Sequence, residues 1–235
     1  MSPASDRPGR PCFTARGVRR GAVETAPLAA FVIPFGIAFG VAASAKGISP
    51  DISVFMSFAI FAGASQFAVI DLWHAPLPLA TLALTVLAVN GRLIMLGAAL
   101  APWLLKIPAG RRFAALLLLN DSNFAYAMAT RDRAEMDAGI LFGSGVIMWV
   151  LWAMSTAVGA LAGSMAGDLS RFGLDAVMVA YFAAVIVGQW KGRADLAPYL
   201  TAAAVAVAGT YVLPPGWHII AGALAGGIVG VWRHG

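Results

Sequence analysis

The stretch PLPLATLALTVLAVNGRLIMLGAALA (76–101) decides the fold class, because it is a long apolar run interrupted by a single charged residue, Arg92. A second run, FAALLLLNDSNFAYAMA (113–129), carries Asp121 as its single charged residue. Runs of this length suit helices that cross a hydrocarbon core of about 30 Å. A charge at that depth costs several kcal/mol, so we expect each of these two residues to have a partner or a function.

The composition indicates a membrane protein. Hydrophobic residues make up 60% of the chain and charged residues 11%, against roughly 25% charged residues in soluble domains. No segment alternates with the two-residue period of a membrane β-barrel. The sequence therefore predicts an all-α polytopic membrane protein with about six to eight membrane segments. The candidate segments are 27–46, 52–72, 77–101, 113–129, 139–163, 174–190, 196–213 and 217–233.

The first 24 residues differ from the rest of the chain. Five arginines fall within residues 7–20, which predicts a basic cytoplasmic tail over 1–24 by the positive-inside rule. We therefore expect no nucleic-acid partner, although the net charge is +5. This part lacks an apolar core of the kind found in signal peptides, so no cleavable signal is expected. Residues 25–235 are predicted to form one transmembrane transport domain in the lipid bilayer.

The basic residues also restrict the topology. Eight plain crossings would place Lys106, Arg111 and Arg112 outside the cell, against the positive-inside rule. If the second segment instead enters and leaves on the same side, these three residues become cytoplasmic. The same form for the sixth segment makes Lys191, Arg193 and Arg233 cytoplasmic. Both segments end in a glutamine that follows small residues, Gln66 and Gln189.

A weak internal similarity accompanies this scheme. Four residues that recur as identical residues 123 positions later are Gly36 as Gly159, Gly40 as Gly163, Val54 as Val177 and Gln66 as Gln189. Chance is one explanation in a chain this rich in small residues. The other is an inverted repeat of 27–130 and 139–233 with two interrupted or re-entrant helices, a layout found in many secondary transporters. The glycines at four-residue spacing are predicted to pack helices closely.

Arg92 and Asp121 are predicted to lie at the same depth. Each is about 12–14 Å from the loop that joins its helix to the other, at about 1.5 Å per residue. They can form a structural ion pair, with the amides of Asn90, Asn120 and Asn123 completing the hydrogen bonds. Alternatively, Arg92 binds a substrate carboxylate with its planar guanidinium, and Asp121 meets an ammonium group or carries a coupling proton. Both alternatives stay open from the sequence.

Several classes of function are excluded or disfavoured by missing motifs. HExxH is absent, and neither a histidine nor a second aspartate lies at membrane depth, which argues against an intramembrane protease. No Walker-type phosphate loop is present, so we do not expect ATP hydrolysis by this chain. The lone Cys12 excludes an intrachain disulfide and a cysteine metal site. We expect no enzyme activity, metal or cofactor, while a passive channel and a structural subunit remain alternatives to a transporter.

Two blocks carry a resemblance to a known family. The first is PFGIAFGVAASAKGISPDISVFMSFAIFAGASQFAVIDL (34–72), and the second is VNGRLIMLGAALAPWL (89–104). Together they resemble the AzlC family of branched-chain amino acid permeases, from about residue 21 to the C-terminus. Two departures from the family pattern leave the exact substrate open. Leu93 stands where the family usually has a histidine, and Asn120-Asp121-Ser122 stands where it typically has Thr-Asp-Glu.

The resemblance implies a function that hydropathy alone does not. It implies export of branched-chain or similar apolar amino acids across a bacterial inner membrane. It also implies a small AzlD-type membrane partner. We further expect the proton gradient to drive this export, with valine, leucine and isoleucine as substrates and methionine as a further candidate. The residue chemistry and the resemblance together predict a substrate site with Asp121 as the candidate for proton coupling. The predicted site residues are Gly63, Ser65, Gln66, Asn90, Arg92, Asp121, Asn123 and Gln189.

Overall fold

The regular elements of the protein are helices. The computed structural model describes residues 12–70, 72–132, 137–165, 183, 186–187, 190, 192–213 and 217–234. In these ranges, helices α5 (Leu79–Leu104) and α8 (Ala138–Met165) are long and apolar enough to cross a membrane, and the bent pair of α1 and α2 adds a third candidate. The prediction of an all-α polytopic membrane protein is confirmed. The described part supplies two or three of the crossings that were predicted for the whole chain.

Helices α1 (Ala15–Ala30) and α2 (Val32–Ala45) form one bent element. They meet at an angle of 61°. Pro34 explains the bend, because it has no N–H to donate to the carbonyl of Ala30 and its ring clashes with that carbonyl. Helix α1 is capped by Thr14, whose Oγ1 accepts from the Gly17 N–H at 2.9 Å. This helix therefore begins inside the range 1–24 that was predicted to be a basic tail.

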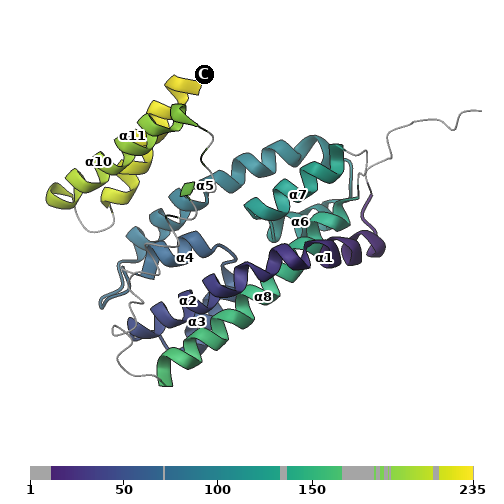
Figure 1. Ribbon diagram of the computed structural model, residues 1–235, viewed down its shortest axis with the longest axis horizontal. Helices are drawn as coiled ribbons and strands as arrows, with labels where there is room; N and C mark the ends of the chain where they lie inside the picture. The colour runs from purple at the N-terminus through teal and green to yellow at the C-terminus, as the bar shows by residue number, and fades with distance from the viewer. Residues whose placement is uncertain are drawn as a thin grey trace, which may run out of the picture.

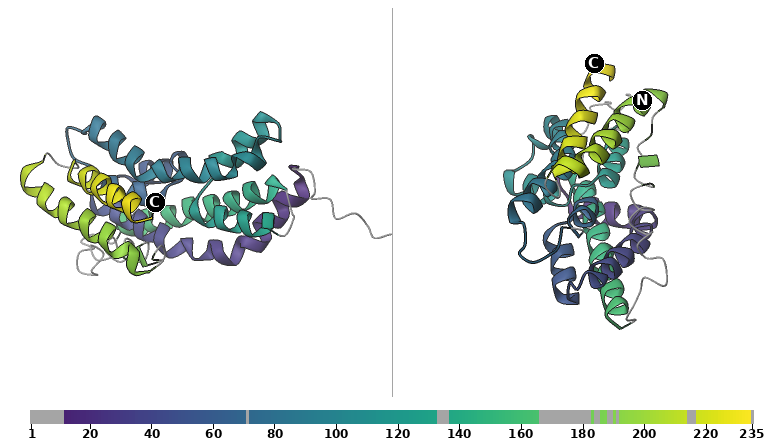
Figure 2. Two further views of the ribbon diagram at one scale, coloured as in Figure 1. Left: turned by 90° about the horizontal axis from the view of Figure 1, so that it is seen from above. Right: turned by 90° about the vertical axis from the view of Figure 1, so that its left-hand side faces the viewer.

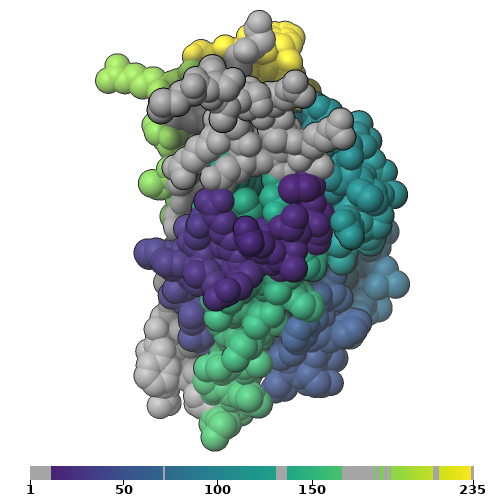
Figure 3. Space-filling view, turned by 90° about the vertical axis from the view of Figure 1, so that its right-hand side faces the viewer, coloured from purple at the N-terminus to yellow at the C-terminus, as the bar shows by residue number. Residues whose placement is uncertain are grey.

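Helix α8 runs alongside α1 and α2 in the same direction (Figure 1). Near the start of α1, Gly21 packs on the backbone of Ile140, and further along α2, Gly40 packs on the backbone of Thr156 and Gly159. The glycines at four-residue spacing therefore pack helices, as predicted. Figure 3 shows α1, in purple, lying across α8, in green. An inverted repeat of 27–130 and 139–233 would make α2 and α8 run in opposite directions, so this repeat is not supported.

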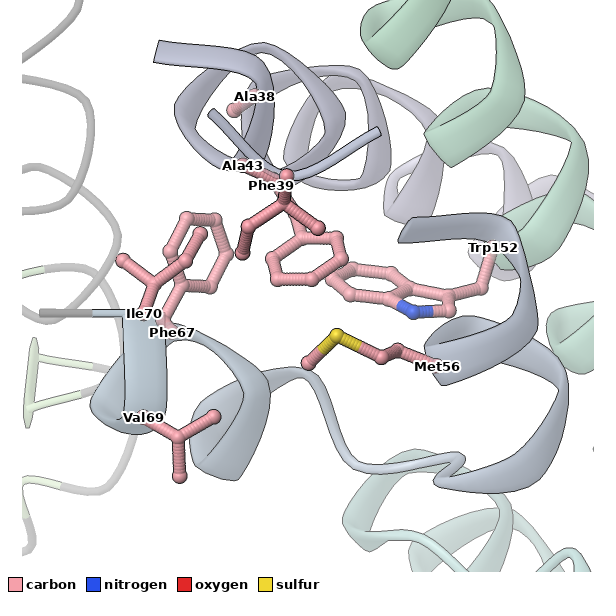
Figure 4. Packing of buried hydrophobic residues seen from close by; sticks show 9 residues of the cluster. Ala38, Phe39, Ala43, Met56, Phe67, Val69, Ile70 and Trp152 are labelled. Atoms are coloured by element: carbon pink, nitrogen blue, oxygen red, sulfur yellow. The ribbon is translucent and has the colours of Figure 1, made fainter. Parts of the chain in front are cut away.

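The second predicted segment forms a hairpin of two short helices. Helices α3 (Pro50–Ala59) and α4 (Gly63–Ile70) are separated by a break at 60–62. The hairpin begins and ends at the same end of the molecule, because Ala43 and Ile48 before it share a buried cluster with Val69 and Ile70 at its end. Figure 4 shows part of this cluster. The hairpin has the re-entrant form that the basic residues predicted.

The fourth predicted segment is also a hairpin, so the prediction of a continuous helix over 113–129 is wrong. Helices α6 (Ala109–Leu117) and α7 (Asp121–Asp132) are separated by residues 118–120. Near the start of α6, Arg111 donates to the carbonyl oxygen of Phe13 at 3.4 Å. Beyond the end of α7, Asp137 accepts from the Thr14 N–H at 3.0 Å. Both contacts lie just before α1, so the hairpin enters and leaves at the end where α1 begins.

The last two helices form a separate antiparallel pair beside α5 (Figures 1 and 2). A short 3-10 turn, Arg193–Asp195, leads into α10 (Leu196–Val212), and α11 (Trp217–His234) follows. Gly222 and Gly226 pack on small residues of α10, as their spacing predicted. The predicted segment 174–190, with Gln189, lies almost entirely outside the described residues.

Candidate functional site

Three helix discontinuities meet at one cavity. It has a volume of about 250 Å³ and lies where the tips of the two hairpins approach the bend between α1 and α2. Helices α5 and α8 supply the remaining walls. The lining residues used below are Phe31 and Phe35 from the bent pair, Phe61 to Ala64 and Leu119 to Ser122 from the hairpin tips, Asn90 and Arg92 from α5, and Met148 and Trp152 from α8.

The two intramembrane charges meet in this cavity. Nη2 of Arg92 lies 3.0 Å from Oδ2 of Asp121. The pairing agrees with the depth predicted from the sequence. Their side chains are 30% and 53% exposed, so the pair is open to the cavity and is not sealed within the protein. A ligand can therefore reach both charges.

Two polar atoms beside the pair have no partner among the described residues. These are Nε of Arg92 and Oδ1 of Asn90, and both are buried. The amide nitrogen of Asn90 is occupied, because it donates to Oγ of Ser65 at 3.2 Å. An unsatisfied buried polar group costs about 1–3 kcal/mol. Because both atoms are buried, a bound molecule recovers part of this cost only where a side-chain rotation brings one of them to the cavity.

Two asparagines fix the tip of the α6–α7 hairpin. The Asn120 N–H donates to Oδ1 of Asn123 at 2.8 Å, and the Asn123 N–H donates to Oδ1 of Asn120 at 3.0 Å. The amide nitrogen of Asn123 also donates to the carbonyl oxygen of Leu118 at 2.7 Å. This reciprocal cap satisfies main-chain groups that a helix break leaves free. Asn123 is fully buried behind the cavity wall, so the geometry gives it a structural role, and its contact with substrate stays a prediction.

Gln66 stabilises the α3–α4 hairpin through hydrogen bonds of its side chain. Its Oε1 accepts from the indole Nε1 of Trp152 at 2.9 Å, and its Nε2 donates to Oγ of Ser57 at 3.1 Å. Ser57 is in turn 2.9 Å from Oγ1 of Thr156. This buried chain of hydrogen bonds ties both halves of the α3–α4 hairpin to α8. Gln66 is buried and is not among the residues that line the cavity, and its contact with substrate stays a prediction.

Each hairpin tip presents a helix N-terminus to the cavity. Helix α4 begins at Gly63 and α7 begins at Asp121, and both residues line the cavity. The first N–H groups of a helix lack partners within the helix, and the helix dipole makes this end positive. A helix N-terminus therefore favours a bound carboxylate.

The opposite side of the cavity is apolar. Phe31 and Phe35 come from the bent pair, and Met148 and Trp152 come from α8. In Figure 4 the Trp152 indole lies beside the ring of Phe39, with 6.1 Å between the ring centroids. These residues were not predicted from the sequence. The one available signal was that Met148 and Trp152 are four residues apart and so share a helix face.

The predicted site residues divide into three groups. Gly63, Asn90, Arg92 and Asp121 line the cavity. Ser65, Gln66 and Asn123 are buried behind it. Gln189 lies outside the described residues. In the part of the chain that the structure describes, no three histidine, cysteine or acidic side chains are grouped to hold a metal ion.

Comparison with known proteins places the chain in a family. The sequence profile described as AzlC protein matches residues 27–166, more than half of the chain. The chain belongs to the AzlC family. It is 30% identical over 215 residues to the inner membrane protein YgaZ of Escherichia coli K12, covering 88% of this chain and 86% of that protein. No solved structure matches the chain.

Two further relatives within the same range of similarity carry different names. The branched-chain amino acid transport protein AzlC of Bacillus subtilis 168 is 28% identical over 209 residues, covering 88% of this chain and 80% of that protein. An uncharacterized membrane protein of Archaeoglobus fulgidus is 32% identical over 218 residues, covering 91% of this chain and 94% of that protein. Membership of the AzlC family identifies the chain as a membrane transport protein.

Proposed function

We propose that this chain is the main subunit of a secondary transporter that exports branched-chain or similar apolar amino acids, driven by the proton gradient. Valine, leucine and isoleucine are the expected substrates, and methionine is a further candidate. The observation that carries the proposal is the open ion pair of Arg92 and Asp121 at the point where two helix N-termini face one cavity. Secondary transporters place substrate sites at such interrupted helices.

The cavity offers a complementary group for each part of an amino acid. Arg92 and the N-terminus of α4 suit the carboxylate. Asp121 and the free oxygen of Asn90 suit the ammonium group. The apolar wall of Phe35, Met148 and Trp152 suits an aliphatic side chain. The name of the Bacillus subtilis relative, a branched-chain amino acid transport protein, supports the same class of substrate.

The ion pair suggests how binding and proton movement are coupled. A zwitterion that enters the cavity replaces the internal pair by two new pairs, Arg92 with its carboxylate and Asp121 with its ammonium group. When the substrate leaves, Asp121 either returns to Arg92 or takes up a proton. In this proposal Asp121 carries the coupling proton, and the internal pair prevents uncompensated charge in the empty site.

The proposal includes a location and a partner. Arg16 and Arg19 of α1 lie at the same end of the molecule as Arg111 and Arg112 of α6. By the positive-inside rule this end faces the cytoplasm, so the chain lies in the bacterial inner membrane with a cytoplasmic N-terminus. A small AzlD-type membrane protein is the proposed partner, as the family resemblance implies.

Export can be tested in cells that lack their own exporter of branched-chain amino acids. The chain is expressed with its partner, the cells are fed leucine- and valine-containing dipeptides, and intracellular amino acid pools are measured. We expect the wild-type chain to lower the leucine and valine pools. Pools that do not change on expression would contradict export and favour a structural subunit.

Arg92→Lys is the matched variant, because it keeps the charge and removes the planar guanidinium. We expect it to insert normally and to lose at least about tenfold in efflux rate, since hydrogen bonds to charged groups are worth about 1.5–3 kcal/mol. Normal efflux by Arg92→Lys would contradict the role in binding the carboxylate. A passive channel differs from a transporter because it shows neither saturation nor counterflow.

A further inference from the structure

Trp152 is held in place on the apolar side of the cavity. Its side chain lines the cavity while the residue is only 4% exposed. The indole N–H donates to Gln66 at 2.9 Å, and the ring stacks on Phe39. Figure 4 shows the indole between Phe39 and Met56. A ring held by a hydrogen bond and by packing on two sides forms a well-defined part of the cavity wall.

The far edge of this ring rests on the start of α4. A Cβ atom added to Gly63 would lie 2.7 Å from Cη2 of Trp152 and 3.0 Å from its Cζ2. Real Cβ atoms do not approach carbon atoms this closely, so a glycine at position 63 is what allows the ring to occupy its place. The same glycine is the first residue of α4, where the helix N-terminus faces the cavity.

The charged side chains and the largest apolar side chains of the cavity come from different elements, although Leu93 of α5 and Leu119 of the α6–α7 tip also line it. The charged and amide side chains belong to α5 and to the tip of the α6–α7 hairpin, whereas the large apolar side chains of Met148 and Trp152 belong to α8. A zwitterion held by Arg92 and Asp121 would therefore direct its side chain towards α8. We propose that Trp152, seated against Gly63, sets the size limit for the substrate side chain. This inference rests on the proposed function, and it adds the residue that decides which apolar amino acids fit.

The test uses one variant that enlarges the space beside the apolar wall and one that reduces it. Trp152→Phe shortens the ring and opens space beside Gly63, while Gly63→Ala pushes the ring towards the cavity. The full-length chain is purified, placed in lipid nanodiscs, and its dissociation constants for L-alanine, L-leucine and L-phenylalanine are measured. Thermal unfolding confirms that each variant is folded. Gly63→Ala removes neither the indole N–H of Trp152 nor the amide of Gln66 that accepts from it, so it tests the inference even if Trp152→Phe is unstable.

The two variants should shift selectivity in opposite directions. One misplaced methylene in a tight apolar pocket changes discrimination by about 10–200-fold. We therefore expect Trp152→Phe to raise the affinity for phenylalanine relative to that for leucine by at least about tenfold. Gly63→Ala should lower the affinity for leucine relative to that for alanine by at least about tenfold. The double variant should return towards the wild-type preference, because the added methyl group fills the space that the smaller ring vacates.

The possible failures are distinguishable. If the wild-type chain binds none of the three amino acids, the proposed function is wrong, and the inference falls with it. If the wild-type chain binds leucine but the folded variants change both ratios by less than about twofold, the proposed function stands and the role of Trp152 is overturned.

Discussion

At the scale of single residues, amide side chains stabilise the backbone of the site, and charged side chains line its cavity. Asn120 and Asn123 satisfy main-chain groups at the broken tip of α6 and α7. Arg92 and Asp121 line the cavity, and their side chains are partly exposed. This division explains how an irregular backbone is tolerated at membrane depth, where it must be buried in protein or line a cavity.

The first prediction concerns Asn123. Asn123→Ala removes the Asn123 half of the reciprocal cap, which leaves the Asn120 N–H without its acceptor and the Leu118 carbonyl without its donor, so it should lower the free energy of unfolding by about 1–3 kcal/mol. Unfolding in mixed micelles measures this change. Ser122→Ala is the matched control, because Ser122 is the exposed neighbour on the same turn, and its effect should be within about 0.5 kcal/mol. Equal stability of the two variants would contradict the capping role.

The pairing of Arg92 with Asp121 was predictable from the sequence, whereas the hydrogen bonds of Gln66 and Asn123 were not. Arg92 and Asp121 could be paired because helix geometry fixes depth from position in the chain. The contacts of Gln66 with Trp152 and of Asn123 with Leu118 depend on how helices pack after folding. Both amides were predicted to contact substrate, since a polar side chain in an apolar run gives the same pattern whether it caps a helix or binds a ligand.

At the scale of elements, one carboxylate joins the starts of two parallel helices. Oδ1 of Asp137 accepts from the Gly139 N–H of α8 at 2.9 Å and from the Thr14 N–H at 3.0 Å. The Thr14 hydroxyl donates to the other oxygen of Asp137 and also accepts from Gly17 of α1. Asp137 therefore caps α8 directly and supports the cap of α1 through Thr14.

The second prediction follows from this shared cap. Asp137→Ala should destabilise the protein by more than the roughly 1 kcal/mol typical of one lost N-cap, because it affects two helices. Asp137→Ser keeps a hydroxyl that can cap α8, but its shorter side chain does not replace both contacts with Thr14, so its loss of stability should be smaller. Thermal unfolding of the two variants compares them. Equal losses for alanine and serine would contradict the shared cap.

The α6–α7 hairpin shows where the prediction of elements failed. Residues 113–129 are apolar enough to look like one crossing helix, and hydropathy does not detect a break of three residues. The sequence did contain a signal, because Asn120 followed three residues later by Asn123 resembles a reciprocal cap. The α3–α4 break was predictable because the basic residues of the next loop require a re-entrant segment.

At the scale of the whole molecule, two hairpins enter from opposite ends and meet at the cavity (Figures 1 and 2). The α3–α4 hairpin starts at the end where α2 finishes, and the α6–α7 hairpin starts where α1 begins. Because α6 and α7 do not cross, α8 starts at the same end as α1. This accounts for the parallel packing of α8 with α1 and α2.

The third prediction is a labelling pattern. A maleimide that does not cross membranes should label Cys12, Arg112→Cys and Asp132→Cys from the cytoplasmic side, each introduced cysteine being tested without Cys12. Lys46→Cys and His74→Cys, which flank the α3–α4 hairpin, should be labelled from the opposite side. Labelling of Asp132→Cys from the same side as Lys46→Cys would contradict the second hairpin, because it would require α6 and α7 to cross the membrane.

The most direct test of the central claim measures which part of the ligand each charge recognises. Binding of L-leucine, of 3-methylbutylamine, which lacks the carboxylate, and of 4-methylpentanoate, which lacks the ammonium group, is measured on the wild-type chain, Arg92→Gln and Asp121→Asn in nanodiscs. On the wild-type chain we expect 3-methylbutylamine and 4-methylpentanoate each to bind at least about tenfold more weakly than L-leucine. On Arg92→Gln the amine should bind almost as well as L-leucine, because the partner of the carboxylate is already gone. On Asp121→Asn the carboxylate ligand should bind almost as well as L-leucine, because the partner of the ammonium group is already gone. Equal losses in all three proteins would contradict an amino acid site at the Arg92–Asp121 pair.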